Sequence, residues 1–315
     1  MSLTYEERRA EFLARIERGE KIEGTDWMPD DYRQYLIRLI AMHGISEIMG
    51  ALPEKEWVPR APTLHRKLAI MAKVQDELGH GQLLLRVAED LVAPLGMNRE
   101  DLLNGLFKGT IHFHNVFHMP APTWADAGII GWLVDGAAII TQGMLVQGSY
   151  APYCRALERI IAEESFHIQH GESICIALAE GTKAQRQMLQ EALNRWWEPL
   201  LFFFGPPPKS ELTKHQDLGL MYRLRNRTNE ELRQRFFHKY VPRIQALGLT
   251  IPDPNLRLDK ETNTWHYTQP DWSKFKAILR NEGPMSKARL ILRHSAWEQN
   301  RWVREVLSTR AAVAV

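Results

Sequence analysis

Apolar residues recur at steps of three and four along the first two thirds of the chain, the spacing that gathers them on one face of an α-helix. The pattern runs through five long stretches, residues 31–52, 64–92, 124–148, 154–180 and 184–204. Proline-bearing segments such as "LPEKEWVPRAP" and "HMPAPT" separate them. Several long helices with short connections predict an all-α fold, a four-helix bundle with extra helices.

The pattern changes after "GPPPKS" at residues 205–210. One more helix is predicted at 228–247, the segment "TIPDPNLRLDKETNTWHYTQPDW" alternates and turns like a small hairpin, and two helices are expected to close the chain. We therefore expect residues 1–204 to form the bundle. Residues 205–315 are expected to complete the same domain with a loop, helices and a small C-terminal appendage.

Composition and charge narrow the class of protein. The 315 residues are 44% hydrophobic and 25% charged with a net charge of +2, which predicts a soluble globular protein and gives no reason to expect nucleic acid or a membrane as partner. Cys154 and Cys175 lack the spacing of a disulfide framework or a thiolate metal site, which fits a cytoplasmic protein. Residues 1–21 carry charges and no apolar core of a secretory signal. The most apolar stretch, 128–148, has Asp135 at its centre, which favours a buried bundle helix over a membrane span.

Two short motifs within the predicted helices carry the chemistry. "DELGH" places Glu77 three residues before His80, and "EESFH" places Glu164 three residues before His167. Residues three apart lie on the same helical face. One Glu-x-x-His occurs by chance in many helical proteins, but both copies here also follow directly on an acidic residue. The repeat indicates a metal site rather than two charged helix faces.

An acidic residue inside an apolar helix precedes each motif. Glu47 lies 30 residues before Glu77 (77 − 47), and Asp135 lies 29 before Glu164 (164 − 135), so the halves are offset by 88 residues at the lone acid and 87 at the motif. Two helical hairpins of this kind supply the six ligands of the carboxylate-bridged two-metal site of ferritin-like bundles. Without a metal, each lone acid costs several kcal/mol unless it is protonated and hydrogen-bonded.

The ligand types narrow the metal. Four carboxylates and two imidazoles without a thiolate suit iron or manganese, and iron is the first choice. The acids just before the motifs, Asp76 and Glu163, are expected to accept hydrogen bonds from the ligand imidazoles, unless they are only exposed helix charges. His43 and His170 each lie one helical turn from a predicted ligand, and each either borders the site or is an ordinary hydrogen-bonded or solvated histidine.

A site of this kind most broadly activates dioxygen for insertion into an organic substrate. A radical-generating ribonucleotide reductase subunit would carry a tyrosine one turn after the first motif's histidine, where this chain has Leu84. A metal-storage shell needs only a shorter four-helix chain. A desaturase acting on acyl chains uses the same six ligand types and stays open.

Segments outside the motifs carry a resemblance over nearly the whole chain, from about Asp26 to the last tryptophan-bearing helix. "DWMPDDYR", "APTLHRKLAIMAKVQDELGHG", "WADAGIIGWLVDGAAI", "QMLQEALNRWWEPLLFFFGP", "NEELRQRF" and "TIPDPNLRLD" resemble the catalytic alpha subunits of the bacterial ring 1,2-phenylacetyl-CoA epoxidases. The resemblance implies a di-iron monooxygenase that uses dioxygen to epoxidise the ring of phenylacetyl-CoA at the 1,2 position, in aerobic phenylacetate catabolism. It places that family's ligands on Glu47, Glu77, His80, Asp135, Glu164 and His167.

The resemblance also implies cofactors and partners. The cofactors are two non-haem iron ions. The partners are a homologous structural ferritin-like protein, a small bridging protein, and a reductase with FAD and an iron–sulfur centre that draws electrons from NADPH. Contacts to coenzyme A are implied at Arg38, His112, Lys214, Arg225 and Asn229. His112 stands where the family usually has a lysine.

The residues themselves add two hypotheses about the substrate. "MYRLRNRTNEE" carries arginines at alternating positions, 223, 225 and 227, and guanidinium groups suit the phosphates of coenzyme A, although such a run is often a solvated face. Met49, Phe107, Phe113 and Trp132 are possible walls of a ring pocket, or plain core.

Two alternatives to the epoxidase stay open at this point. One is a di-iron oxygenase or desaturase that acts on another thioester, such as benzoyl-CoA. The other is a non-catalytic ferritin-like bundle that partners a true oxygenase. The complete set of six ligand-type residues opposes the second alternative.

Overall fold

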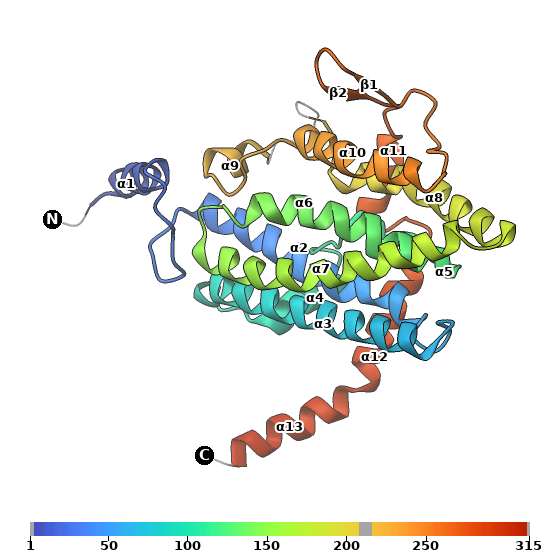
Figure 1. Ribbon diagram of the computed structural model, residues 1–315. Coiled ribbons are helices and arrows are strands. Elements are labelled where there is room, and N and C mark those ends of the chain that lie inside the picture. The colour runs from blue at the N-terminus through green and yellow to red at the C-terminus, as the bar shows by residue number, and fades with distance from the viewer. Residues whose placement is uncertain (1–2, 208–215, 314–315) are drawn as a thin grey trace.

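The computed structural model describes residues 3–207 and 216–313 and is mostly helical (Figure 1). The helices of the first two thirds are α1 (Tyr5–Glu17), α2 (Asp30–Lys55), α3 (Leu64–Val92), α4 (Arg99–Phe107), α5 (Trp124–Ile129), α6 (Asp135–Leu145), α7 (Ala151–Ala179) and α8 (Lys183–Phe203). Two short 3-10 turns, η1 (Ala93–Leu95) and η2 (Asn115–His118), and a π-helical turn, η3 (Ile130–Val134), join them.

The later part of the chain contains α9 (Gln216–Met221), α10 (Asn229–Ala246), α11 (Trp272–Leu279), α12 (Ser286–Gln299) and α13 (Arg301–Val313). Between α10 and α11, strands β1 (Arg257–Asp259) and β2 (Thr264–His266) form an antiparallel hairpin in which Leu258 faces Trp265. The predicted hairpin is confirmed. The prediction of two closing helices was wrong in number, because three short helices follow the hairpin.

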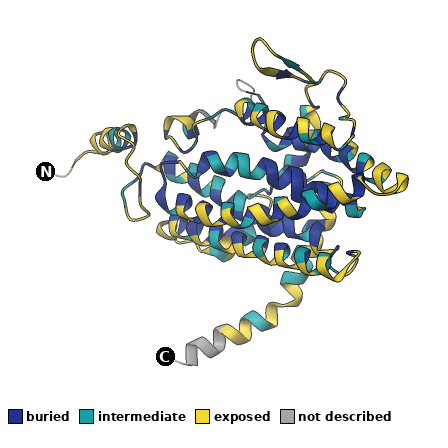
Figure 2. Cartoon of the chain, in the orientation of Figure 1, coloured by how far each residue is buried: buried dark blue, intermediate teal, exposed yellow. Residues whose placement is uncertain are grey.

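Four helices, α2, α3, α6 and α7, form the ferritin-like bundle and lie side by side in Figure 1. Helix α2 packs along α3, α7 packs against η3 and α6, and α3 packs against α7. Their facing sides are apolar and buried, and the outward sides of α3 and α7 are exposed (Figure 2). This burial of apolar surface is the main force that holds the bundle together. The predicted all-α, ferritin-like fold is confirmed.

Local signals set where several helices begin. Thr63 precedes α3 and accepts a hydrogen bond from the Arg66 amide. Thr182 before α8 and Thr228 before α10 form capping boxes with the residue three positions on. A side-chain oxygen at this position satisfies amide groups that have no partner inside the helix, which fixes the first turn.

The segments after α8 pack on the bundle and around its end. Helix α10 contacts α6, and α11 and α12 contact η2. The buried guanidinium of Arg233 on α10 donates to the backbone oxygen of Leu201 on α8. Helix α13 extends away from the body (Figure 1).

Two stretches of helix are long and apolar enough to cross a membrane by length and composition, Asp30–Lys55 and Trp124–Leu145. In their most apolar windows, 61% and 72% of the residues are buried inside the protein. Both stretches are core helices of the bundle, and each carries one of the lone acids, Glu47 or Asp135, on a buried face.

Candidate metal centre and its cavity

The four bundle helices bring all six predicted ligand residues together in the interior. Their ligand atoms form two overlapping groups, and within each group the atoms lie within 4.8 Å of one another. One group is Glu47, Glu77, His80 and Glu164, and the other is Glu77, Asp135, Glu164 and His167. All six side chains are buried. Glu77 and Glu164 belong to both groups, so each group has one lone acid, one histidine and two shared carboxylates.

Both histidines turn the same ring nitrogen inward. His80 Nδ1 lies 3.6 Å from Glu164 Oε1 and 3.8 Å from Glu47 Oε2, with no hydrogen-bond partner among the described residues. His167 Nδ1 lies 3.1 Å from Glu164 Oε2 and 3.5 Å from Glu77 Oε1. The two Nδ1 atoms are therefore the imidazole atoms that face the buried carboxylates of the two ligand groups.

The outward nitrogen of each histidine is bonded to an acid of the other hairpin. His80 Nε2 lies 2.7 Å from Glu163 Oε2, and His167 Nε2 lies 3.2 Å from Asp76 Oδ2. A carboxylate in this position fixes the tautomer with the proton on Nε2 and leaves the Nδ1 lone pair free. The Glu163 and Asp76 side chains are 33% and 35% exposed. The acid before each motif thus orients the histidine of the other motif.

The surroundings shift the pKa values of the buried carboxyl groups in different directions. Burial raises the pKa of Glu164 to about 8, and the charge of Glu47 adds to the rise. Burial raises the pKa of Asp135 to about 6. Burial acts on Glu47 as well, but the hydrogen bond from His43 and the imidazole of His80 outweigh it and hold the pKa of Glu47 well below its usual range. Carboxylates this close cannot all stay ionised without added positive charge.

A buried ion pair beside the site was missed in the sequence analysis. The Lys73 ammonium is 1% exposed and lies 2.5 Å from Glu54, 2.8 Å from Glu77 and 3.1 Å from Asp135. Lys73 precedes Glu77 by four residues, so helical periodicity places it on the same face of α3. That spacing was a usable signal, and Lys73 stabilises the acids of both hairpins.

A π-helical turn directly precedes Asp135. Ile130–Val134 form η3, and α6 begins at Asp135. Gly131 in this turn lies against Gly171 of α7, since an added Cβ at Gly171 would fall inside van der Waals contact with the Gly131 and Trp132 backbone. Single π turns inside longer helices occur often at functional sites because they displace the side chains that follow.

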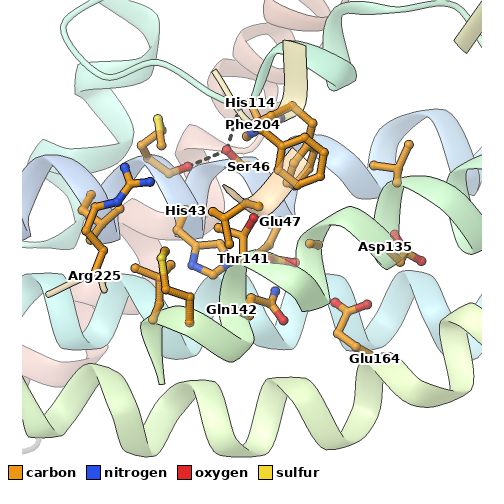
Figure 3. Close-up of a pocket in the computed structure, with 18 of the residues that line it drawn as sticks. His43, Ser46, Glu47, His114, Asp135, Thr141, Gln142, Glu164, Phe204 and Arg225 are labelled. Atoms are coloured by element: carbon orange, nitrogen blue, oxygen red, sulfur yellow. Dashed lines mark hydrogen bonds and ion pairs between the residues drawn. The ribbon is translucent and has the colours of Figure 1, made fainter. Parts of the chain in front are cut away.

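A cavity of about 220 Å³ opens from the carboxylates toward the later part of the chain. Glu47, Glu77, Asp135 and Glu164 line this cavity, and Arg225 and Asn229 belong to the same lining. Figure 3 shows Asp135 and Glu164 on one side of the cavity and Arg225 on the other. The remaining wall is largely apolar, with Leu39, Met42, Phe117, Val134, Ala138, Leu145, Phe203 and Phe204. Pockets that take small organic ligands have this mixture of apolar walls and few polar groups.

The residues that were expected to contact coenzyme A lie in different places. Arg225 donates to Asn229 Oδ1 at 2.9 Å and to the Arg227 backbone, and buried Asn229 donates to the Pro206 backbone. Arg38 is exposed, next to the cavity residue Tyr35. His112 is half-buried near His118 and is not part of the cavity wall. Lys214 falls outside the described residues.

The other sequence candidates separate into neighbours of the site and core. His43 Nε2 lies 2.8 Å from Glu47 and its Nδ1 lies 2.7 Å from the Tyr153 hydroxyl, so it borders the site. His170 is buried and its ring stacks on Phe166. The four proposed ring-pocket residues are not part of the cavity wall; they are Met49, Phe107, Phe113 and Trp132.

The residues present fit a pair of divalent cations. Five buried carboxylates lie around this site, and with the Lys73 ammonium their formal charges give −4; they are Glu47, Glu54, Glu77, Asp135 and Glu164. Two divalent ions would balance that sum. The inward His80 Nδ1 atom without a hydrogen-bond partner is a further sign that the site takes a cation. Oxygen-rich sites with two imidazoles suit iron or manganese.

Comparisons with known proteins agree with this geometry. A family model described as phenylacetic acid catabolic protein matches residues 5–302. One component of the 1,2-phenylacetyl-CoA epoxidase of Escherichia coli (strain K12) is 45% identical over 309 residues, which cover 98% of this chain and 97% of that protein. The chain therefore belongs to the phenylacetic acid catabolic protein family and is a homologue of this epoxidase component.

Proposed function

We propose that this chain is the oxygen-activating component of a multicomponent monooxygenase that epoxidises the ring of phenylacetyl-CoA at the 1,2 bond. The observation that carries the proposal is the pair of overlapping ligand groups, whose four carboxylates line a cavity together with Arg225 and Asn229. The 45% identity to the Escherichia coli epoxidase component supports the same substrate.

Two iron ions are the proposed cofactor. Glu47 and His80 would help to hold one ion and Asp135 and His167 the other, and Glu77 and Glu164 would contribute to both because they belong to both groups. When bound, the iron pair supplies the electron transfer to dioxygen that makes an oxygen atom reactive. Glu163 and Asp76 keep the Nδ1 lone pairs aimed inward.

The protein's own contribution to the reaction is positioning. The apolar wall of the cavity excludes water, and it places a flat apolar ring beside the carboxylate end. At the other end, the Arg225 guanidinium offers donors to an anionic or carbonyl group of the coenzyme A portion. Binding energy from that remote portion would orient the ring. The coenzyme A contacts proposed at Arg38, His112 and Lys214 belong to the same hypothesis.

The stoichiometry requires an external source of electrons. One atom of dioxygen enters the ring as the epoxide, and the other leaves as water after two electrons and two protons are added. We propose that an FAD and iron–sulfur reductase supplies the electrons from NADPH. The Escherichia coli relative is named as one of several subunits, which fits a multisubunit enzyme. We propose that the other partners are a homologous structural ferritin-like protein and a small bridging protein, and that the complex is cytoplasmic.

We also propose that residues 205–315 complete the domain formed by residues 1–204. The contact of α10 with α6 and the bond from Arg233 to the Leu201 backbone support this division, because both tie the later segment to the bundle.

The test is turnover of the iron-loaded chain with its helical partner and reductase. Phenylacetyl-CoA and benzoyl-CoA are offered separately under labelled dioxygen, and products are analysed by mass. The proposal predicts one labelled oxygen in the phenylacetyl product and much slower turnover of benzoyl-CoA. Oxidation of benzoyl-CoA alone, or dehydrogenation without label, would support another acyl-CoA oxygenase or a desaturase. No turnover by a chain that binds iron and substrate would favour a non-catalytic partner.

A further inference from the structure

One buried amide in the cavity wall, that of Gln142, has no hydrogen-bond partner among the described residues. Gln142 on α6 is 2% exposed, and neither its Nε2 nor its Oε1 has a hydrogen-bond partner in the part of the chain that the structure describes. Buried polar atoms are nearly always paired, since leaving them without water or a partner is unfavourable. The preceding residue, Thr141, lines the same cavity and donates to the Ala137 backbone. The Gln142 amide is therefore available to form a hydrogen bond with a group that enters the cavity.

The position of Gln142 defines which part of a ligand it meets. In Figure 3, Gln142 lies between Arg225 on one side and the Asp135 and Glu164 carboxylates on the other. It follows Asp135 by seven residues, which is two helical turns and about 10 Å along the axis. Side chains on a helix tilt toward its N-terminus, here toward Asp135, and the long Gln142 side chain brings its amide closer to the carboxylates.

We propose that the Gln142 Nε2 amide donates a hydrogen bond to the thioester carbonyl oxygen of the bound acyl-CoA. This inference rests on the proposed function. With the ring at the carboxylate end, the thioester is the first polar group along the substrate, one methylene from the ring. The amides of the pantetheine arm follow several bonds later, nearer the outer part of the cavity. The carbonyl is therefore the acceptor that the position of Gln142 matches.

This contact would also make the site selective for the number of carbon atoms between the thioester carbonyl and the ring. Fixing the carbonyl fixes how far the ring reaches toward the carboxylates. In benzoyl-CoA the ring is attached directly to the carbonyl, so its ring would stop about 1.5 Å short, the length of one C–C bond. Displacements of about 1 Å at a reacting centre can lower a rate by about 100-fold. Gln142 is thus proposed to help select phenylacetyl over benzoyl thioesters.

The test is a binding cycle that removes either partner of the hydrogen bond. Dissociation constants are measured by calorimetry on the full-length, iron-loaded chain without dioxygen. The ligands are phenylacetyl-CoA and its thioether analogue, 2-phenylethyl-CoA, in which a methylene replaces the carbonyl. The wild-type protein should bind the thioester about 10-fold more tightly than the thioether, as expected for one buried hydrogen bond. Gln142→Met should bind both about equally, with the thioester weakened about 10-fold.

Two controls separate this role from a structural one. Thr141→Val changes the same wall without touching the proposed bond, so the ratio of the two dissociation constants should stay at the wild-type value. Ligand-free Gln142→Met should melt no lower than wild type, because methionine of similar size removes two unpaired buried atoms.

The outcomes distinguish this inference from the proposed function. If wild type binds the thioester tightly and Gln142→Met keeps the wild-type ratio, the carbonyl contact does not exist although the function stands. A clear drop in the melting temperature of ligand-free Gln142→Met would mean that the amide holds the fold together, which also contradicts the inference. If wild type binds phenylacetyl-CoA no better than coenzyme A alone, both the inference and the proposed function are wrong.

Discussion

The two hairpins of the bundle supply the same ligand types through different backbones. In the first, Gly44 of α2 lies against Gly81 of α3; in the second, Gly131 of η3 lies against Gly171 of α7. These glycines allow each helix pair to approach closely. The lone acid follows its glycine by three residues in the first hairpin (47 − 44) and by four in the second (135 − 131).

The π-helical turn accounts for this extra residue. A π turn holds one residue more than an α turn, which matches the one extra residue between Gly131 and Asp135. The offset between the halves returns from 88 residues at the lone acid to 87 at the Glu-x-x-His motif because the second hairpin is one residue shorter between the two, 29 residues against 30.

The neighbours of the two lone acids also differ. Glu47 pairs with His43, which in turn contacts Tyr153, and this side faces the cavity. Asp135 pairs with Lys73, which is closed off in the core. The two lone acids thus have different partners: Glu47 pairs with a histidine that borders the cavity, and Asp135 pairs with a buried lysine. Substitutions at these neighbours therefore test how far each hairpin depends on its own surroundings.

The largest effect is expected from removing the buried lysine. Lys73→Met leaves Glu54 and Asp135 buried without their cation, which should lower the free energy of unfolding of the metal-free protein by about 3–5 kcal/mol. Urea unfolding measures this loss. Lys274→Met, which breaks the exposed pair with Glu198, is the control and should change stability by less than about 1 kcal/mol. Equal losses in the two variants would contradict the special role of Lys73.

The acids that orient the histidines should matter unequally. Glu163→Gln is expected to weaken metal binding about 10- to 100-fold, because Glu163 lies closer to His80 and is itself held by Arg159 at 3.1 Å. Asp76→Asn, with a longer bond to His167, should have the smaller effect. Competition with a chelator measures both affinities. A larger loss of metal affinity in Asp76→Asn than in Glu163→Gln would contradict this prediction.

The close contact between Gly131 and Gly171 beside the π turn should leave no room for a side chain at position 171. Gly171→Ala forces a Cβ into the Gly131 backbone and should cost about 1–3 kcal/mol of stability. Gly143→Ala on α6 is the matched control. Its Cβ meets nothing within 4 Å, so it should stabilise the helix by up to about 1 kcal/mol. Thermal unfolding of both variants checks the pair, and a neutral Gly171→Ala would mean that the helices are free to separate there.

The metal-free protein should lose stability as the pH rises from about 6 to about 9. The folded pKa of Glu164 is about 8 against an ordinary 4.5, because of burial. That of His80 is about 9 against 6.5, since Glu47, Glu164 and Glu163 outweigh burial. The folded state therefore binds more protons than the unfolded state across this window, and stability should fall by about 2 kcal/mol per pH unit near its middle.

Glu47 and His167 have lowered pKa values and act below this pH window. Bound metal displaces the protons and should flatten the dependence. Urea unfolding at several pH values, with and without metal, gives the slopes. A metal-free protein as stable at pH 9 as at pH 6 would contradict these proton positions.

The candidate ligand residues could be picked out from the sequence because the signal for each of them is local. Each Glu-x-x-His lies within one helical turn, and each lone acid stands out in an apolar helix. Helical periodicity also places Lys73, four residues before Glu77, and Gln142, seven residues after Asp135, on the faces of the candidate ligands. Neither residue belongs to a recognisable motif, so both were missed. The π turn left no such signal, because the one-residue mismatch of the repeat lies after Asp135, between it and Glu164.

The cavity wall could not be predicted because it is assembled from distant segments. Met42 comes from α2, Phe117 from η2 and Phe203 from α8, and only packing brings them together. The apolar residues proposed from sequence instead fill other places: Trp132 is in the core, and Phe113 stacks on His118. Apolar periodicity identifies buried positions, but it does not distinguish residues that line a cavity from residues packed in the hydrophobic core.

The most direct test of the two-metal centre is the iron content of the folded chain, prepared anaerobically with its helical partner. The account predicts about two irons per chain. A Glu77→Ala, Glu164→Ala variant should retain almost none, because these residues belong to both ligand groups, whereas Glu47→Ala should keep about one. A parent chain that folds and binds phenylacetyl-CoA yet holds no iron would contradict the account.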